Sequence, residues 1–244
     1  MGERFSRPQE AGKVRQMSPS EAQKRDAGEA AAALVEPGMT VGLGTGSTAS
    51  WFVKALAARG FAARCVATSQ ATADLARSLG LNLAGLDEVK AIDLTVDGAD
   101  EIGPGLSLIK GGGGALLREK LVWQASRRCV VIADQGKTVE TLGRFPLPIE
   151  VVAFGAQHTV RRIRSVLELQ GIDALPALRV QSGAPVRTDS GNLIYDAPCE
   201  RIANPAALAD ALKQVTGVVE HGLFLGLADR ALVGTDQGVI TLHP

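Results

Sequence analysis

The stretch MTVGLGTGSTASWFVKALAARG, residues 39–60, joins a short apolar run, a glycine-rich loop and a helical pattern. The apolar run predicts a buried strand, and the residues from Ser47 onward predict a helix that Gly60 terminates. Glycines at positions 42, 44 and 46 let the backbone turn tightly between the two elements and approach a ligand closely. A strand that turns directly into a helix is the opening half of a βαβ unit.

Strands and helices alternate on both sides of this stretch. A helix is expected over residues 18–35, capped by Ser18 or Ser20, and apolar strands and helical patterns then follow one another to about residue 142. The alternation predicts βαβ units around a mostly parallel sheet, so the expected fold class is α/β.

The pattern changes after residue 143. FPLPIEVVAFG carries two prolines, and strands are expected at VVAFG, ALRVQS and NLIYDAP, with helices at QHTVRRIRSVLELQG and NPAALADALKQVTG. Residues 144–220 therefore predict a second, α+β segment. The C-terminal HGLFLGLADRALVGTDQGVITLHP predicts a strand and a hairpin around TDQG that return to the first segment.

The composition argues against several classes of protein. Lys and Arg number 26, as do Asp and Glu, and this balance gives no support to a nucleic-acid partner. No apolar run reaches the roughly 18 residues that a membrane span needs. The three cysteines lack CxxC spacing, which argues against a disulfide frame or a zinc site and favours a reducing, cytoplasmic setting. Residues 1–17 carry no apolar signal-peptide core and are expected to form a disordered leader.

The glycine-rich loop is the first candidate binding motif. It lies before a helix start, whose free N–H groups attract anions, and its hydroxyl side chains add donors. It matches neither the Walker pattern nor the GxGxxG dinucleotide fingerprint. Two interpretations stay open here, a phosphate cradle or a tight turn in which Ser or Thr caps the helix. The loop residues concerned are Thr45, Gly46, Ser47 and Thr48.

The second motif is DGADE, residues 97–101, which follows the apolar strand AIDLTV. Ligands of open α/β sheets bind outside the carboxyl ends of strands, where Asp97 and Asp100 are expected to lie. Carboxylates this close in sequence suit proton transfer. A solvated turn and a magnesium site are the alternatives.

The third motif is KGGGGALLREK, residues 110–120. Its glycine run exposes backbone N–H groups before a helix, and Lys110 can supply positive charge where an oxyanion develops. Glu119, in that helix, is either a candidate base or a surface glutamate favoured by the helix dipole. Lys137, in IADQGKTV, follows another strand end and is either a ligand contact or an exposed loop lysine.

These motifs are all expected after strands at one edge of the sheet, where they would converge. No metal or redox-cofactor motif accompanies them. The residues therefore predict an enzyme without a cofactor or metal that acts by proton transfer on a small phosphorylated substrate.

GLGTGSTA, DGADE, KGGGGALLREK and FPLPIEV occur in this order, at about these spacings, in the A-type ribose-5-phosphate isomerases. From about residue 18 to its end the chain resembles this family. The resemblance implies a Rossmann-like domain of residues 18–143 and 221–244, with a smaller α+β domain of residues 144–220 inserted near the C-terminus. It also implies interconversion of ribose 5-phosphate and ribulose 5-phosphate, and a homodimer.

The resemblance assigns roles to individual residues. Glu119 matches the general base, Asp97 and Asp100 the acids that bind substrate, one or the other of which helps to open the ring, and Lys110 the active-site lysine. Gly114 stands where alanine is common, and a helix start should tolerate either residue. The substrate-binding set that it implies is Thr45, Gly46, Ser47, Thr48, Gly98, Ala99, Gly111, Gly112, Gly113, Lys137 and Lys24.

Two other functions share some of these features. A sugar-phosphate sensor also uses a glycine-rich phosphate loop, but it normally carries a helix-turn-helix, and the N-terminal residues are too short and poorly patterned for one. A coenzyme A transferase would use a glutamate as nucleophile and would need a larger site.

Overall fold

The stretch 39–60 forms the strand, turn and helix that its pattern predicts. In the computed structural model, which describes residues 17–244, β1 (Thr40–Leu43) leads into α2 (Ser47–Ala58). Gly60 follows the helix with φ +68°, a conformation that glycine adopts without strain. Apart from residue 17, the expected leader lies outside the described residues.

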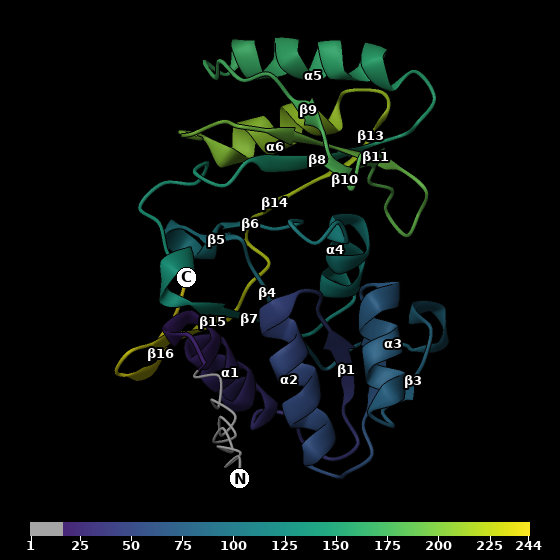
Figure 1. The fold of residues 1–244 in the computed structure, drawn as a ribbon, viewed down its shortest axis with the longest axis vertical. Helices are drawn as coiled ribbons and strands as arrows, with labels where there is room; N and C mark the ends of the chain where they lie inside the picture. Colours follow the sequence, from purple (N-terminus) through teal and green to yellow (C-terminus); the bar gives the residue numbers. More distant parts are fainter. Residues whose placement is uncertain (1–16) are drawn as a thin grey trace, which may run out of the picture.

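The main sheet is mostly parallel, as the alternation of strands and helices predicts (Figure 1). Within residues 17–244 it has seven strands in the order β16-β15-β7-β4-β1-β2-β3, and only the terminal β15–β16 pair is antiparallel. The fold class is therefore confirmed. Its strands are β2 (Arg64–Ala67), β3 (Asn82–Leu83), β4 (Leu94–Gly98), β7 (Cys129–Asp134), β15 (Arg230–Thr235) and β16 (Gly238–Leu242), together with β1.

Helices cover both faces of this sheet. On one face α1 (Pro19–Ala32) and α2 share a core with alternate residues of the strands, such as Val130. On the other face Trp123 of α4 (Leu116–Gln124) packs on the residues between them, such as Val131. The helix α3 (Gln70–Ser78) also belongs to this part of the chain. Ser18 caps α1, because its hydroxyl accepts a hydrogen bond from the Glu21 N–H.

A second, antiparallel sheet lies beyond the main sheet, at the top of Figure 1. In the described part of the chain its order is β13-β8-β12-β9, and α5 (Ala156–Leu169) and α6 (Pro205–Lys213) share its apolar core. The division of the chain at residues 144 and 220 stays a prediction. The strands are β8 (Leu147–Val151), β9 (Ala177–Leu178), β12 (Leu193–Ala197) and β13 (Val218–His221), and a small hairpin of β10 (Val180–Gln181) and β11 (Ala184–Pro185) follows β9.

The expected strand at VVAFG is wrong, because β8 begins earlier and ends at Val151. Proline is normally excluded from a central strand because it has no N–H to donate. Pro148 is tolerated in β8 because pairing with β13 starts only at Ile149, opposite His221. The Pro148 carbonyl instead accepts a hydrogen bond from the Gly222 N–H.

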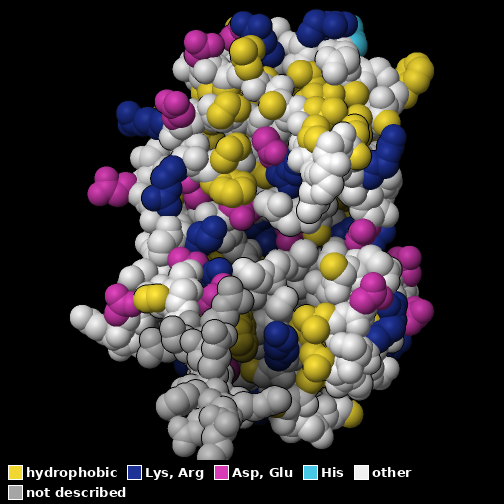
Figure 2. All heavy atoms as spheres, viewed as in Figure 1, with side chains coloured by type: hydrophobic (Ala, Val, Ile, Leu, Met, Phe, Trp, Pro, Cys, Tyr) yellow, Lys and Arg dark blue, Asp and Glu magenta, His cyan; other side chains and the backbone are white. Residues whose placement is uncertain are grey.

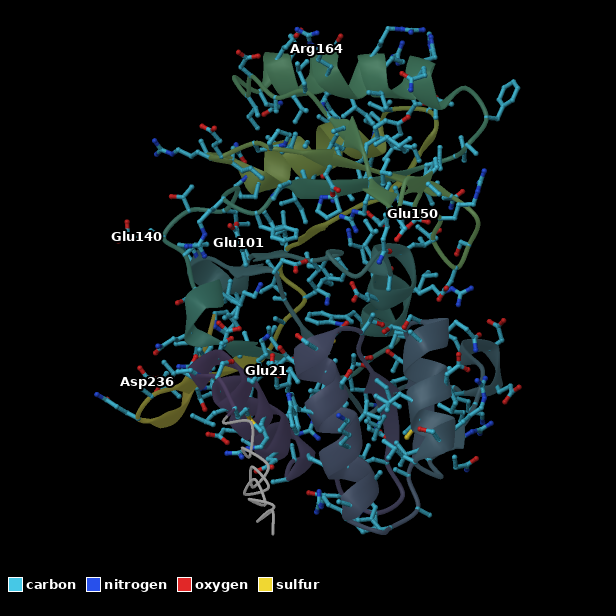
Figure 3. All side chains as sticks on the ribbon, viewed as in Figure 1. Glu21, Glu101, Glu140, Glu150, Arg164 and Asp236 are labelled. Atoms are coloured by element: carbon cyan, nitrogen blue, oxygen red, sulfur yellow. The ribbon has the colours of Figure 1, made fainter. Side chains whose placement is uncertain are left out.

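A third, small sheet joins the two parts of the molecule. It consists of β5 (Glu101–Ile102), β6 (Leu108–Ile109) and β14 (Leu223–Phe224). The carboxylate of Glu101, labelled in Figure 3, accepts hydrogen bonds from the N–H groups of Gly143 and Phe145 and so fixes the connection to β8. Lys110 and the glycine run follow β6, so the expectation that they follow a strand of the main sheet is wrong.

The remaining regular structure is three single-turn 3-10 helices, Leu86–Glu88, Pro104–Leu106 and Gln135–Lys137, in residues 17–244. No helix in this described range is both long and apolar enough to cross a membrane. Acidic and basic side chains are interspersed over the face shown in Figure 2, in keeping with the zero net charge.

Candidate active site

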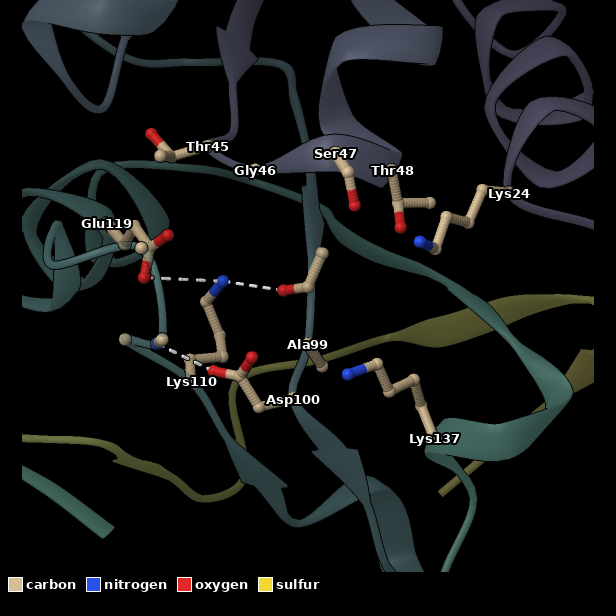
Figure 4. Close-up of a pocket in the computed structure, with 14 residues that line it drawn as sticks. Lys24, Thr45, Gly46, Ser47, Thr48, Ala99, Asp100, Lys110, Glu119 and Lys137 are labelled. Atoms are coloured by element: carbon tan, nitrogen blue, oxygen red, sulfur yellow. Dashed lines mark hydrogen bonds and ion pairs between the residues drawn. The ribbon is translucent and has the colours of Figure 1, made fainter. Parts of the chain in front are cut away.

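One pocket is lined by nearly all of the site residues that the sequence analysis predicts. It lies at the carboxyl ends of β1 and β4 of the main sheet, and Figure 4 shows its lining. Asp97 is the one predicted site residue outside the lining, because its side chain is fully buried beneath the pocket. The lining residues are Lys24, Thr45, Gly46, Ser47, Thr48, Gly98, Ala99, Asp100, Lys110, Gly111, Gly112, Gly113, Glu119 and Lys137.

The glycine-rich loop presents an uncapped helix start to the pocket. The N-cap residue of α2 is Gly46, at φ +111°, and no side chain caps the helix. The alternative in which Ser or Thr caps it is therefore wrong. The Thr45 hydroxyl lies 2.8 Å from the hydroxyls of Thr68 and Ser69, which hold the loop from behind. The free N–H groups and the positive dipole end of α2 favour an anion here.

Lys24 and Lys137 reach toward the same end of the pocket as Ser47 and Thr48, opposite Glu119 (Figure 4). Lys24 comes from α1, where its Nζ lies 2.8 Å from the Glu21 carboxylate. Lys137 ends the third 3-10 helix. Two ammonium groups, two hydroxyls and a helix start together supply the positive charge and the hydrogen-bond donors that suit an anion.

Asp97 ties the glycine-rich loop to the lysine. Its carboxylate accepts hydrogen bonds from the N–H groups of Thr45 and Gly98 and lies 3.0 Å from Lys110 Nζ. Gly44 leaves room for it, since a Cβ at Gly44 would lie 2.2 Å from Asp97 Oδ1. Asp97 therefore supports the pocket from below.

Lys110 is almost completely buried between two carboxylates. Its Nζ lies 3.4 Å from Glu119 Oε2 and donates a 2.6 Å hydrogen bond to the Gly98 carbonyl. Burial lowers the pKa of this ammonium, but the Asp97 and Glu119 carboxylates more than offset it and leave the pKa raised. Lys110 thus stays protonated and offers its charge to the pocket.

Glu119 is a buried carboxyl, so the alternative of a surface glutamate is wrong. It stands in the first turn of α4, its side chain is 3% exposed, and in residues 17–244 its Oε2 has no hydrogen-bond partner. Burial raises its pKa to about 8, with the Asp97 charge adding to the rise and Lys110 opposing it. A carboxyl with a pKa near neutral pH is suited to accept and return a proton.

The glycine run forms a tight turn that approaches Asp100. The Gly112 N–H donates to Asp100 Oδ2 at 2.8 Å, and the Gly114 N–H donates to the Gly111 carbonyl. A Cβ at Gly112 would lie 2.6 Å from Asp100 Oδ1. Gly114 has φ +79° and precedes the helix, so the expectation that alanine fits equally well there is wrong.

Asp97, Asp100 and Glu119 do not form a metal-ligand set. Within the described residues, no group of three or more His, Cys, Asp or Glu side chains is placed to hold a metal ion. The magnesium alternative for DGADE therefore has no ligands beyond its own carboxylates.

Sequence reasoning missed the residues that hold this site from a distance. The rings of Trp123 and Phe224 lie 5.5 and 5.4 Å from Lys110 Nζ. Lys120 points away from the pocket and pairs with Glu220 of β13 at 2.7 Å. Arg179, from the second sheet region, donates to carbonyls of the glycine run. No local pattern marks these long-range contacts.

The chain is similar to known proteins along most of its length. A protein of Caulobacter sp. (strain K31) named ribose-5-phosphate isomerase A is 69% identical over 223 residues, which cover 91% of this chain and 98% of the relative. The crystal structure of ribose 5 phosphate isomerase A from Neisseria gonorrhoeae is 35% identical, with a TM-score of 0.86 over 94% of this chain and 99% of that one.

A solved D-ribose-5-phosphate isomerase in complex with phospho-erythronic acid is 38% identical, with a TM-score of 0.85 over 92% of this chain and 99% of that one. Residues 64–238 match the family described as ribose 5-phosphate isomerase A (phosphoriboisomerase A). The chain belongs to the ribose 5-phosphate isomerase A family.

Proposed function

We propose that the chain interconverts D-ribose 5-phosphate and D-ribulose 5-phosphate, with Glu119 as the base that moves a proton between C2 and C1. The observation that carries the proposal is a buried Glu119 carboxyl, with its pKa raised to about 8, beside Lys110 Nζ in a pocket whose far end carries hydroxyls and lysines. That arrangement separates a proton-transfer end from a phosphate end.

The phosphate end consists of the start of α2 with Lys24 and Lys137. The 5-phosphate accepts hydrogen bonds from the loop N–H groups and from the Ser47 and Thr48 hydroxyls, and the two ammonium groups balance its charge. Binding energy gained there holds the sugar carbons against Glu119.

Asp100 assists ring opening, because it lines the pocket while Asp97 is fully buried. Its carboxylate takes the proton of the C1 hydroxyl and passes it to the ring oxygen as the ring C–O bond breaks, which leaves a C1 aldehyde and a free hydroxyl. Asp97 has a different role in this proposal. Its carboxylate lies 3.0 Å from Lys110 Nζ, and it neutralises and orients that ammonium group.

Proton transfer then follows at C2. Glu119 takes the C2 proton, the C–H electron pair forms the C1–C2 double bond, and negative charge develops on O1. Lys110 and the N–H groups of the glycine run stabilise that charge. Glu119 returns the proton to C1 while the O2 proton passes to O1, so that O2 becomes the carbonyl of the ketose and O1 becomes its hydroxyl.

We propose that phospho-erythronic acid binds this chain as well, since a related isomerase was solved in complex with it. Its carboxylate carries negative charge at the end away from the phosphate. That charge matches the developing enediolate and would lie near Lys110 and the glycine run.

We also propose a homodimeric, cytoplasmic protein with a small sugar phosphate as its partner. The described cysteines, Cys65, Cys129 and Cys199, are free and buried, which supports a reducing compartment. Phe154 and Leu169 are 94% and 85% exposed, and large apolar side chains at the surface support a contact between copies. Light scattering of the purified protein tests the dimer.

The test of the activity is conversion of ribose 5-phosphate by the purified chain in the presence of a chelator. We expect ribulose 5-phosphate to form without added metal, and unphosphorylated ribose, the matched control, to react far more slowly because it lacks the anchoring group. Binding of ribose 5-phosphate without any turnover would contradict the proposal and would favour a sugar-phosphate sensor.

A further inference from the structure

We propose that Arg179 is a positioning residue for the proton transfer: it holds the Gly111 and Gly112 carbonyls so that the Gly113 N–H faces the substrate oxygen that becomes negative. The inference rests on the proposed isomerase function and deepens it. Arg179 lies between β9 and β10, outside the lining of the pocket, and acts through the glycine run.

The contacts of Arg179 form a continuous bridge from the second sheet to the pocket. Its Nη1 donates to the Gly111 carbonyl at 2.9 Å and to the Gly112 carbonyl at 3.0 Å. Its Nε and Nη2 bind both carboxylate oxygens of Asp196 on β12. The side chain of Arg179 is 15% exposed; its bond to the Gly111 carbonyl is partly buried and its bond to the Gly112 carbonyl is exposed.

The contacts to the carbonyls also fix the direction of the N–H group in the same peptide. A trans peptide is planar, so its C=O and N–H point in opposite directions. The Gly112 carbonyl and the Gly113 N–H belong to one peptide, and the carbonyl accepts its hydrogen bond from Arg179, which lies outside the lining of the pocket. Among residues 17–244 the Gly113 N–H has no hydrogen-bond acceptor, and Gly113 lines the pocket.

The preceding peptide already has both ends occupied. Its carbonyl, on Gly111, binds Arg179, and its N–H, on Gly112, binds Asp100. In the described residues the Gly113 N–H, like the Gly111 N–H, is thus a donor of the turn without an acceptor. A guanidinium on the carbonyl also polarises the peptide and makes this N–H a stronger donor.

The glycine run needs such a support from outside. Glycines have the largest backbone freedom of any residue, so four in a row do not fix their own peptide planes. The bidentate pair with Asp196 fixes the plane of the guanidinium, and the Arg179 N–H bonds the Ile194 carbonyl at 2.8 Å. A stabilised oxyanion depends on donors that are oriented before the reaction.

The test compares the parent with Arg179→Met, Arg179→Lys and Asp196→Asn in ribose 5-phosphate turnover. The matched control is Arg187→Met, because Arg187 is exposed on the same segment and donates to a single carbonyl, Gly191. We expect kcat of Arg179→Met to fall about 10 to 100-fold, below or near the loss from removing an oxyanion donor outright. KM should stay within about threefold, because phosphate binding is untouched.

Ligand affinities separate positioning from a loss of fold. In Arg179→Met the affinity for phospho-erythronic acid should fall along with kcat, while the affinity for inorganic phosphate and the fraction folded stay those of the parent. Arg179→Lys keeps the charge and should recover part of the rate. Asp196→Asn keeps Arg179 and should show a smaller loss in the same direction.

Three results would overturn the proposal. These are parent-like kcat in a folded Arg179→Met, equal loss of phosphate and phospho-erythronic acid affinity, or an effect no larger than that of Arg187→Met. If the parent itself does not turn over ribose 5-phosphate, the proposed function fails instead, and the two failures are thereby distinguished. If Arg179→Met does not fold, Asp196→Asn decides by the same criteria.

Discussion

Glu119 and Lys120 are neighbours on α4, yet they belong to two buried lysine–carboxylate clusters of opposite character. On the pocket side, Lys110 lies between Asp97 and Glu119, with Asp100 nearby, so carboxylates outnumber lysines. On the other side, Glu220 lies between Lys120 and Lys213, at 2.7 and 3.2 Å, so lysines outnumber carboxylates.

The two carboxyls differ in pKa although burial raises the pKa of both. At Glu119 the Asp97 charge adds to burial, and the pKa reaches about 8. At Glu220 the Lys120 ammonium more than offsets burial, and the pKa falls below its ordinary value. The local excess of charge therefore decides whether the pKa of a buried carboxyl is raised or lowered.

The largest expected effect is the loss of turnover when Glu119, in the cluster on the pocket side, is replaced. Glu119→Gln should lower kcat about 10² to 10⁴-fold, the usual contribution of a positioned general base, without loss of fold. Glu168→Gln, an exposed helix glutamate paired with Arg164, is the matched control and should leave kcat unchanged. Near-normal turnover in Glu119→Gln, measured beside the parent, would remove Glu119 from the role of base.

The second effect is on stability. Lys120→Met leaves the buried Glu220 carboxylate with only a partly exposed partner, and should lower the free energy of unfolding by about 3 kcal/mol. Lys213→Met removes that partner, whose side chain is 46% exposed, and should lower it by less than about 1 kcal/mol. Urea unfolding measures both. Equal losses would show that the buried pair holds α4 no better than the surface pair.

A third effect follows from the raised pKa of Glu119. Between the ordinary carboxyl pKa and about 8, the folded chain holds a proton that the unfolded chain has lost, so stability falls as pH rises. Glu119→Gln removes this dependence. The free energy of unfolding of the variant minus that of the parent should therefore rise from pH 6 to pH 7, by at most about 1.4 kcal/mol. A difference between the two proteins that stays constant with pH would contradict the raised pKa.

The smallest effect is a shift in the pH profile. Glu119 must be ionised to act as a base, so kcat/KM of the parent should rise with pH through a midpoint near 8 and level off above it. The Asp100 charge contributes to the raised pKa, so Asp100→Asn should move this limb to lower pH even though its maximum rate falls. Asp74→Asn, an exposed control on α3, should leave the limb in place. A limb that moves upward in Asp100→Asn would contradict the electrostatic explanation.

Local patterns predicted much of this molecule. The strand, loop and helix of residues 39–60 were predictable because Gly46 and Gly60 act within their own turns. The position of β8 was not predictable from local sequence. Pro148 fits into this strand because the pairing with β13 ends at Ile149 and does not include Pro148. The motifs contain the residues that line the pocket apart from Lys24, which lies inside α1 and was expected only from the family resemblance.

The parts that escaped prediction depend on contacts distant in sequence. Whether Glu119 is buried depends on how α4 packs, and the helical pattern alone left a surface role open. Arg179 lies in a segment of short strands with no motif of its own, and its link to Gly111 and Gly112 exists only after the second sheet has folded against the pocket. Lys120 and Glu220 likewise meet across a separation of 100 residues.

The most direct test of the contrast between the two clusters is the titration of both carboxyls by NMR, with ¹³C at the glutamate side-chain carboxyl carbons. Glu119→Gln and Glu220→Gln assign the two resonances by their disappearance. We predict that the Glu119 resonance titrates near pH 8 and that the Glu220 resonance titrates below its ordinary value of 4.5. A Glu119 carboxyl that titrates at or below 4.5, like Glu220, would contradict the assignment of Glu119 as the base poised for proton transfer.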